Sequence, residues 1–220
     1  MQIGNPSYKK CPHCRESNEY YFGPFFVNLY GYTEWSDGEI FQQLPSFEKT
    51  ELQKCNSCNQ YYWFTQYLGG LSFENYVEAA KYFQEEYSKK SIANLLFKNR
   101  NKRRLLYIRL HILRRYNDTI RIHPLNERID NKKIKSEYER LIFAENAKHL
   151  IHLLKIFKPN NHLLIAEIYR NLGEFKKAKN EITKLNDVTI KELILTHIEN
   201  ENRDVITIKQ PLTKPKTHLK

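Results

Sequence analysis

Four cysteines are the residues whose type and spacing most clearly suggest chemistry. They form two C-x-x-C pairs with forty residues between them, Cys11 with Cys14 and Cys55 with Cys58. Each spacing lets a tight turn direct two thiolates at one ion, and two such turns complete a tetrahedral four-sulfur site. Because all four coordination positions are used, none stays open for catalysis. The sequence therefore predicts one structural Zn²⁺ bound by Cys11, Cys14, Cys55 and Cys58.

Two other uses of these residues fit the sequence less well. A redox dithiol would be expected beside a strand–helix–strand pattern, and it needs one pair rather than two. His13 lies inside the first pair and could replace a cysteine as a ligand, but its place within the turn indicates a bystander. Arg15 and Asn59 follow the two pairs, at positions where a positive φ favours glycine.

The segments around the cysteines are rich in aromatic and β-branched side chains and are separated by turn residues. We expect strands at residues 20–22, 25–30, 39–43, 50–54 and 61–67. Strands flanking paired knuckles are typical of a zinc ribbon, which we place at residues 1–70. Its aromatic residues could stack bases, although filling a small core is the simpler role; they are Tyr30, Tyr32, Trp35, Tyr62 and Trp63.

From Leu71 onward the apolar residues recur with a helical period. We expect helices at residues 73–89, 102–116, 137–157, 162–172, 174–185 and 189–202, and a loop at 120–135. The predicted fold class is thus α+β, with a small β-rich ribbon followed by an all-α domain at residues 71–202. The basic tail at residues 203–220 contains Pro211 and Pro215, and we expect it to be disordered.

The fourth and fifth predicted helices resemble a tetratricopeptide repeat. The matching positions are Ile165, Ala166, Tyr169, Gly173, Phe175, Ala178 and Ile182, in a hairpin at residues 162–185. The match departs at His162, where a tryptophan is common, and no proline closes the unit. Since single repeats are not stable alone, we expect the third and sixth helices to stack on either side.

The chain as a whole resembles a group of uncharacterised bacterial proteins that join an N-terminal zinc ribbon to a tetratricopeptide-like half. The resemblance is carried by the cysteine pairs, Trp35-Ser36-Asp37-Gly38, the run Cys58 to Trp63, Ile108-Arg109-Leu110, Tyr116-Asn117-Asp118 and residues 165–175. It implies the architecture and no particular reaction.

The net charge of +11 is unevenly distributed. Residues 1–70 contain five basic and seven acidic residues, whereas residues 98–121 contain nine basic residues and Asp118 alone as an acid. Seven of the twelve arginines lie between Arg100 and Arg121. Such a stretch favours nucleic acid or an acidic protein as a partner, whereas the acidic ribbon argues against phosphate binding by that part.

Plotted at 100° per residue, the second predicted helix separates an apolar arc from a polar one. The polar arc contains Arg100, Arg103, Arg104, Tyr107, His111, Arg114 and Arg115. These residues could contact nucleic acid or an acidic partner, or they could form a solvated face paired with Glu137, Glu139 and Glu145. Arg109 lies inside the apolar arc, so we expect a buried ion pair with Glu139, Glu145 or Glu167, which Asn117 and Asp118 could join.

Signals of enzymatic activity are weak. The sequence has no phosphate-binding glycine loop and no G-x-S-x-G elbow. The spacing of Arg104 and His111 faintly resembles the arginine–histidine pair of HEPN-type ribonucleases, but six residues intervene and Leu105 stands where a polar residue is usual. The protein is therefore expected not to be an enzyme, and no small-molecule substrate is evident.

The leading functional hypothesis is an adaptor that binds another protein, because helical hairpins of this kind form concave surfaces that accept peptides. The alternative is an RNA- or DNA-binding protein that uses the basic helix and tail; a HEPN-like ribonuclease is a weaker one. Exposed arginines would favour nucleic acid, and cover by the glutamates of residues 137–157 would favour the adaptor. Reduced cysteines and the lack of a signal or membrane segment predict a cytoplasmic protein.

Overall fold

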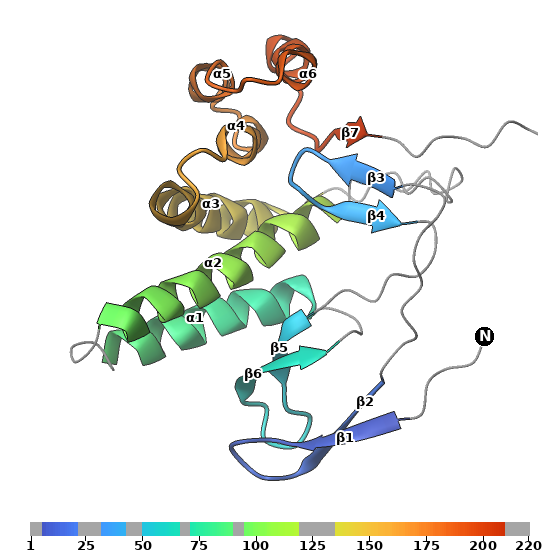
Figure 1. Ribbon diagram of the computed structural model, residues 1–220, viewed down its shortest axis with the longest axis vertical. Coiled ribbons are helices and arrows are strands. Elements are labelled where there is room, and N and C mark those ends of the chain that lie inside the picture. Colours follow the sequence, from blue (N-terminus) through green and yellow to red (C-terminus); the bar gives the residue numbers. More distant parts are fainter. Residues whose placement is uncertain are drawn as a thin grey trace, which may run out of the picture.

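The computed structural model describes residues 6–21, 32–42, 50–66, 71–89, 95–118 and 135–209 of the 220-residue chain. In these segments, short antiparallel strands near the N-terminus are followed by six helices, which confirms the predicted α+β class (Figure 1). The strand predicted at residues 25–30 lies outside the described residues, as does the predicted loop except for Lys135.

The described strands pair into three small sheets with the orders β1–β2, β4–β3–β7 and β5–β6. Their bounds are Pro6–Lys10 (β1), Ser17–Tyr21 (β2), Tyr32–Trp35 (β3), Ile40–Gln42 (β4), Thr50–Lys54 (β5), Tyr61–Gln66 (β6) and Thr207–Lys209 (β7). β4, β5 and β6 lie where strands are predicted, whereas β1, β3 and β7 were not expected. These three short strands contain too few apolar residues to produce a clear alternating pattern.

The helices are α1 (Phe73–Lys89), α2 (Leu95–Asp118), α3 (Glu137–Phe157), α4 (His162–Asn171), α5 (Phe175–Ile182) and α6 (Val188–Glu199). α3 begins with a capping box in which Ser136 and Glu139 bond each other's backbone N–H groups. α2 begins seven residues before its predicted start, because the polar run at residues 98–104 separates its apolar first turn from the apolar stripe that begins at Leu105. A search of the described helices finds no membrane-spanning candidate.

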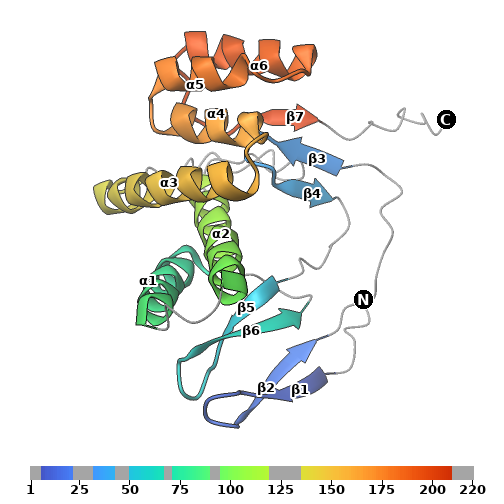
Figure 2. The ribbon, with the colours of Figure 1, turned by 60° about the vertical axis from the view of Figure 1, so that its left-hand side comes forward.

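α2 is the central helix of the molecule, with α1 on one side and α3 on the other (Figure 2). Ile108 and Ile112 pack with α1 and with Leu52 and Tyr61 of the β5–β6 hairpin. Leu113 packs with residues of α3 and α4 in a second cluster. Each such buried side chain contributes about 1.5–3 kcal/mol, so apolar packing fixes α2 on two sides.

α4, α5 and α6 form a third cluster at the far end of the molecule. Ala166 and Ala178 are fully buried in it, and their small side chains let α4 and α5 approach closely. Gly173 joins these two helices with φ +78°, a conformation that costs glycine little. The helical hairpin is therefore present, and its assignment to the tetratricopeptide family stays a prediction.

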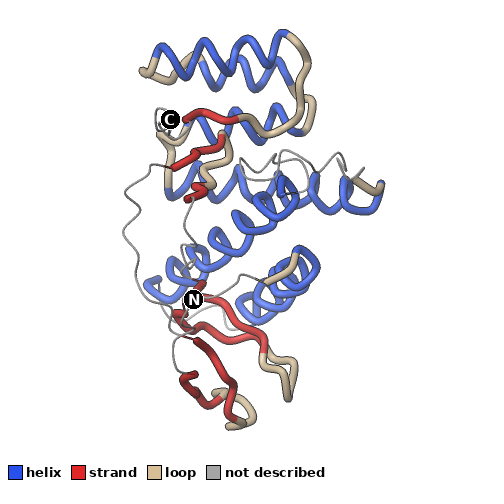
Figure 3. The backbone as a smooth tube through the Cα atoms, turned by 90° about the vertical axis from the view of Figure 1, so that its right-hand side faces the viewer, coloured by secondary structure: helices blue, strands red, loops and turns tan. Residues whose placement is uncertain are grey.

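The disordered tail predicted from residue 203 is wrong for residues 203–209 (Figure 3). Val205 and Ile206 are buried, and β7 pairs with β3 in antiparallel register. The guanidinium of Arg170 also donates hydrogen bonds to the carbonyl groups of Asn202 and Asp204. This segment is ordered by partners that lie far away in the sequence; residues 210–220 lie outside the described part.

Candidate metal centre and basic pocket

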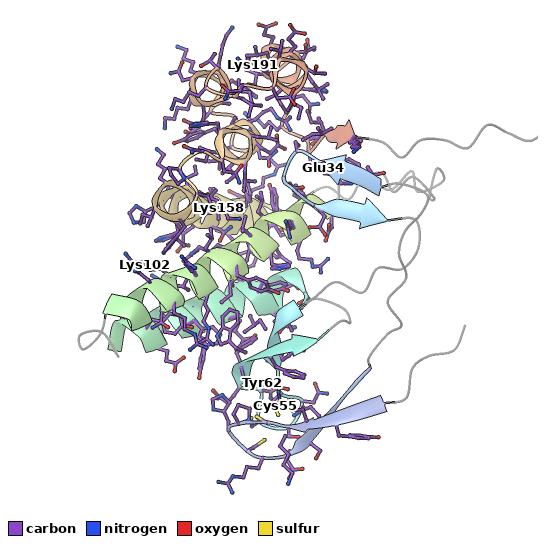
Figure 4. The ribbon with its side chains drawn as sticks, viewed as in Figure 1. Glu34, Cys55, Tyr62, Lys102, Lys158 and Lys191 are labelled. Carbon is purple, nitrogen blue, oxygen red and sulfur yellow. The ribbon has the colours of Figure 1, made fainter. Side chains whose placement is uncertain are left out.

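The four cysteines come together between two hairpins. Cys11 and Cys14 lie in the turn after β1, and Cys55 and Cys58 in the turn after β5, where Figure 4 labels Cys55. Their Sγ atoms all lie within 4.8 Å of one another, and the pairs Cys11–Cys58 and Cys14–Cys55 are 3.8 and 3.7 Å apart. A disulfide needs about 2.05 Å. The four cysteines are free thiols in an arrangement that could hold a metal ion.

The two cysteine turns have the same backbone geometry. In the first, the N–H of Cys11 bonds the carbonyl of Glu16 at 2.8 Å, and the N–H of Arg15 bonds the carbonyl of Cys11 at 2.9 Å. In the second, Cys55 and Asn59 make the equivalent bonds at 3.0 and 2.9 Å. Arg15 and Asn59 have φ +63° and +58°, the left-handed conformation expected after each pair. The two turns therefore present their thiols in matching ways.

Residues around the cluster connect the hairpins further. The side-chain amide of Asn18 donates to Cys55 Sγ at 3.6 Å, and its Oδ1 accepts the N–H of Asn56 at 3.3 Å. His13 is not among the residues placed to hold a metal ion; its Nε2 lies 3.2 Å from the carbonyl oxygen of Tyr61. Nothing in the spacing of residues signalled Asn18.

The electrostatics of the cluster favour a bound cation. The backbone N–H of Cys58, together with Ser57 and the Asn18 amide, lowers the pKa of Cys55 to about 6 despite burial. The backbone at Glu16 acts to lower the pKa of Cys14, but burial and the neighbouring thiols raise it to about 12. One thiolate therefore disfavours a second at this spacing, and a cation would relieve that repulsion.

The C-terminal half of the polar arc of α2 contacts other parts of the protein. Arg114 donates to the carbonyl of Gly38 at 2.9 Å and lies 3.0 Å from Glu39 in the turn before β4. Arg115 pairs with Asp118 at 3.0 Å. His111 is only 4% exposed, stacks on Tyr76 with ring centroids 4.9 Å apart, and so offers no accessible base for a HEPN-like reaction.

The N-terminal half of the arc lines a cavity of about 580 Å³, which we term the basic pocket. It is lined by Lys9 of β1, Trp63 and Phe64 of β6, and Arg100, Arg103, Arg104 and Tyr107 of α2. Arg104 lies 4.7 Å from the ring centre of Trp63, and Lys9 Nζ lies 3.8 Å from that of Phe64. The structure thus brings two aromatic residues and a lysine of the ribbon to the arginines of the helix.

Arg109 is 7% exposed, and its partners differ from those expected. Its guanidinium donates to Gln84 Oε1 at 2.8 Å and to Asn146 Oδ1 at 3.2 Å, while Asn146 Nδ2 donates to the carbonyl of Arg109. The prediction of a carboxylate partner is wrong, because amide oxygens of α1 and α3 satisfy these donors. Burial lowers the pKa of Arg109, and Glu145 opposes this at longer range.

A buried polar cluster that sequence reasoning missed holds the β3–β4 turn on the helices. Asp37 accepts a 2.9 Å hydrogen bond from Asn117 at the end of α2, and both are at most 1% exposed. Glu167 and Arg170 of α4 form a fully buried pair at 2.7 Å. Burial raises the pKa of Glu167, and Arg170 acts against this shift. The hydrogen bond and the ion pair are buried, and Ser36 of the turn also acts on Glu167, so the cluster has a structural role in joining the turn to α2 and α4.

A scan against models of known protein families, a search of curated proteins and a search of solved structures each return no match. The function of the two sites therefore has to be inferred from their own geometry.

Proposed function

We propose that the cysteine cluster binds one structural zinc ion and that the protein binds nucleic acid through the N-terminal half of α2. The zinc assignment rests on the sulfur spacing. With Zn–S bonds of about 2.3 Å, a tetrahedral site places its sulfurs about 3.8 Å apart. The closest Sγ pairs, at 3.7 and 3.8 Å, fit that value.

The role of the ion would be to join two hairpins that share few other contacts. Cys11 and Cys14 follow β1 while Cys55 and Cys58 follow β5, so each hairpin supplies two thiolates. Zinc supplies folding free energy in such sites and, with four protein ligands, has no open position for substrate. Tetrahedral four-sulfur sites also accept iron, which the test has to distinguish.

Elemental analysis tests the zinc proposal. The purified protein should contain about one zinc ion per chain and lack the visible absorption of an iron–thiolate centre. Cys55→Ser should lose the metal and the ordered hairpins, whereas Ser57→Ala, at an exposed position in the same turn, should keep both. Iron in place of zinc, or a metal-free Cys55→Ser protein with folded hairpins, would contradict the proposal.

The nucleic-acid proposal is carried by the arginines of the basic pocket, which no carboxylate in the described part of the chain neutralises; Arg104 also interacts with Tyr87. Among the described residues, Arg100, Arg103 and Arg104 make no ion pair; Arg103 and Arg104 instead lie near the rings of Phe157 and Trp63. Glu139 is held in the capping box at Ser136, and neither Glu137 nor Glu145 pairs with these arginines. The glutamates of α3 therefore leave these arginines available to an external partner, which favours nucleic-acid binding over an adaptor role.

An adaptor remains the second candidate. Tyr138 and Leu141 of α3 are 67% and 64% exposed, and neighbouring apolar side chains of this kind can contact a protein partner. The face of α4 that would line a repeat groove is, however, already covered, because Arg170 and Asn171 bond residues 202–204 of the same chain. A peptide would therefore have to bind elsewhere.

Binding of labelled single- and double-stranded RNA and DNA over a salt series tests the nucleic-acid proposal. We expect micromolar or tighter affinity, with log K falling linearly as log salt rises, by about 0.7–0.9 per phosphate contacted. If no binding is seen near physiological salt, the proposal fails and an acidic protein partner becomes the hypothesis to test.

A further inference from the structure

We propose that the basic pocket is a subsite for one nucleotide of a single-stranded nucleic acid, with its base stacked in the pocket and its phosphates held by the flanking arginines. This inference rests on the proposed nucleic-acid function and specifies the strand type and the residues. RNA and DNA share the required chemistry, and direct comparison of the RNA and DNA strands of the same sequence in the experiment below shows which one the pocket prefers.

The helix brings its four pocket residues to one face. Arg100, Arg103, Arg104 and Tyr107 are spaced three, four and seven residues apart, so they project side by side from α2. Arg100 and Arg103 are exposed, while Arg104 and Tyr107 are half-buried beside the ribbon. Two exposed cations thus lie outside two half-buried side chains, an arrangement suited to phosphates outside and a base within.

The charge of the pocket favours an anion. Among the described residues, its lining contains Lys9 and three arginines and no carboxylate. At the other end of α2, the arginines have acidic partners in Glu39 and Asp118. Guanidinium groups form bidentate hydrogen bonds with phosphate oxygens. Those of Arg100 and Arg103 have no competing ion pair in the described part of the chain.

The aromatic walls favour a base rather than a phosphate alone. Trp63 and Tyr107 meet edge to face at 5.8 Å, and Arg104 lies over Trp63 as a planar cation. Bases stack on aromatic rings and on guanidinium planes. The cavity of about 580 Å³ falls within the usual range of small-molecule sites. A duplex hides its bases within its stack, so only a single strand can present one here.

The metal centre and the pocket share the same strands. Lys9 precedes Cys11 by two residues, and Trp63 and Phe64 follow Cys58 on β6. Three of the pocket residues are therefore positioned by the hairpins that the cysteines join. The pocket exists only where the ribbon meets the helix, and metal removal should abolish it.

The test compares variants of the full-length, zinc-loaded protein by fluorescence anisotropy. The probes are a labelled single-stranded RNA, the same DNA sequence, its duplex, and heparin as a polyanion without bases. We expect the single strands to bind about tenfold more tightly than the duplex. Arg104→Lys keeps the charge but loses the stacking plane, so it should reduce this preference several-fold while leaving the salt slope unchanged.

A second pair of variants separates pocket residues from general charge. Arg103→Ala should weaken single-strand binding by roughly tenfold at low salt, because it removes a phosphate contact. Lys102→Ala, at a neighbouring position of α2 outside the pocket lining (labelled in Figure 4), removes the same charge and should change affinity less than about twofold. Circular dichroism and zinc content check that each variant is folded.

The outcomes distinguish the two proposals. If the wild type binds none of the probes, the nucleic-acid function itself fails. If it binds strands and duplex equally, or if Arg103→Ala and Lys102→Ala have equal effects, nucleic-acid binding stands and the pocket subsite is overturned. Complete competition by heparin at equal charge would likewise show a polyanion surface without base stacking.

Discussion

The two halves of α2 carry the same kinds of side chain but make different contacts. In the C-terminal half, Arg114 and Arg115 bond Glu39, Asp118 and the carbonyl of Gly38. In the N-terminal half, Arg100 and Arg103 form no ion pair among the described residues and line the basic pocket. One helical pattern of arginines therefore provides both an internal anchor and an open basic surface.

The difference comes from the element that lies against each half. The turn between β3 and β4 presents Asp37 and Glu39 to the end of α2, where Asn117 and Arg114 bond them. The pocket residues at the start of the helix instead lie beside Trp63 and Phe64 of β6, which are aromatic and cannot form ion pairs with arginine. A helical wheel shows which residues share a face, but only tertiary structure decides what that face contacts.

The largest effect expected from this comparison concerns His111, where the two halves meet. Burial, with smaller contributions from Arg114 and Arg115, lowers the pKa of His111 to about 3. The unfolded chain takes up this proton below its ordinary pKa of 6.5, whereas the folded chain does not. Stability should therefore fall with decreasing pH, by about 3 kcal/mol between pH 6.5 and about pH 4.

Denaturant unfolding at several pH values measures this slope. His111→Gln should make stability less dependent on pH in that window, at the cost of lost packing against Tyr76. His152→Gln, on the exposed face of α3, is the matched control and should leave the slope as it is in the wild type. Equal slopes in the wild type and His111→Gln would show that His111 does not control the acid response.

A second prediction contrasts Arg109 with Arg103 on the same helix. Arg109→Ala should destabilise the fold by about 2–3 kcal/mol, because it leaves the buried Asn146 oxygen without its donor and opens space in the core. Arg103→Ala should change stability by less than about 0.5 kcal/mol, since Arg103 is exposed. Denaturation midpoints at constant zinc concentration measure both, and similar losses would remove the distinction between the two halves.

The sequence predicts well what depends on neighbours in the chain. The spacing of the cysteines correctly predicted that the four residues come together. The bounds of α1 and α3 agree with those predicted, because a capping residue and an apolar period mark each helix. The position of Arg109 in the apolar arc pointed to a buried guanidinium. Local pattern, however, could not show that amides rather than carboxylates would bind it.

Contacts between distant segments account for what the sequence did not reveal. The N–H of Ile206 bonds Ser36 Oγ across 170 positions, so no local signal marked residues 203–209 as ordered. The basic pocket joins Lys9 to Trp63 and to Arg104 through three elements whose proximity is a tertiary property. Strand alternation places Trp63 on the same face of β6 as Tyr61, toward the helices, and this is the clearest signal that could have linked it to them.

The smallest expected effect is a change in stability that has opposite signs for substitutions at the two ends of α2. Arg100 lies three and four residues from Arg103 and Arg104, so Arg100→Gln should relieve like-charge repulsion and raise stability by about 0.2–0.5 kcal/mol at low salt. Arg115 pairs with Asp118 in the last turn, so Arg115→Gln should lower stability by a similar amount.

Both effects should shrink at high salt, because these charges are partly or fully exposed and are screened. Paired thermal melts at low and high salt measure them. If Arg100→Gln also weakens nucleic-acid binding while it stabilises the fold, the unpaired arginines cost stability and are explained by binding. A destabilising Arg100→Gln would instead indicate that Arg100 has a partner within the protein, and the basic pocket would lose the feature that favours an external anion.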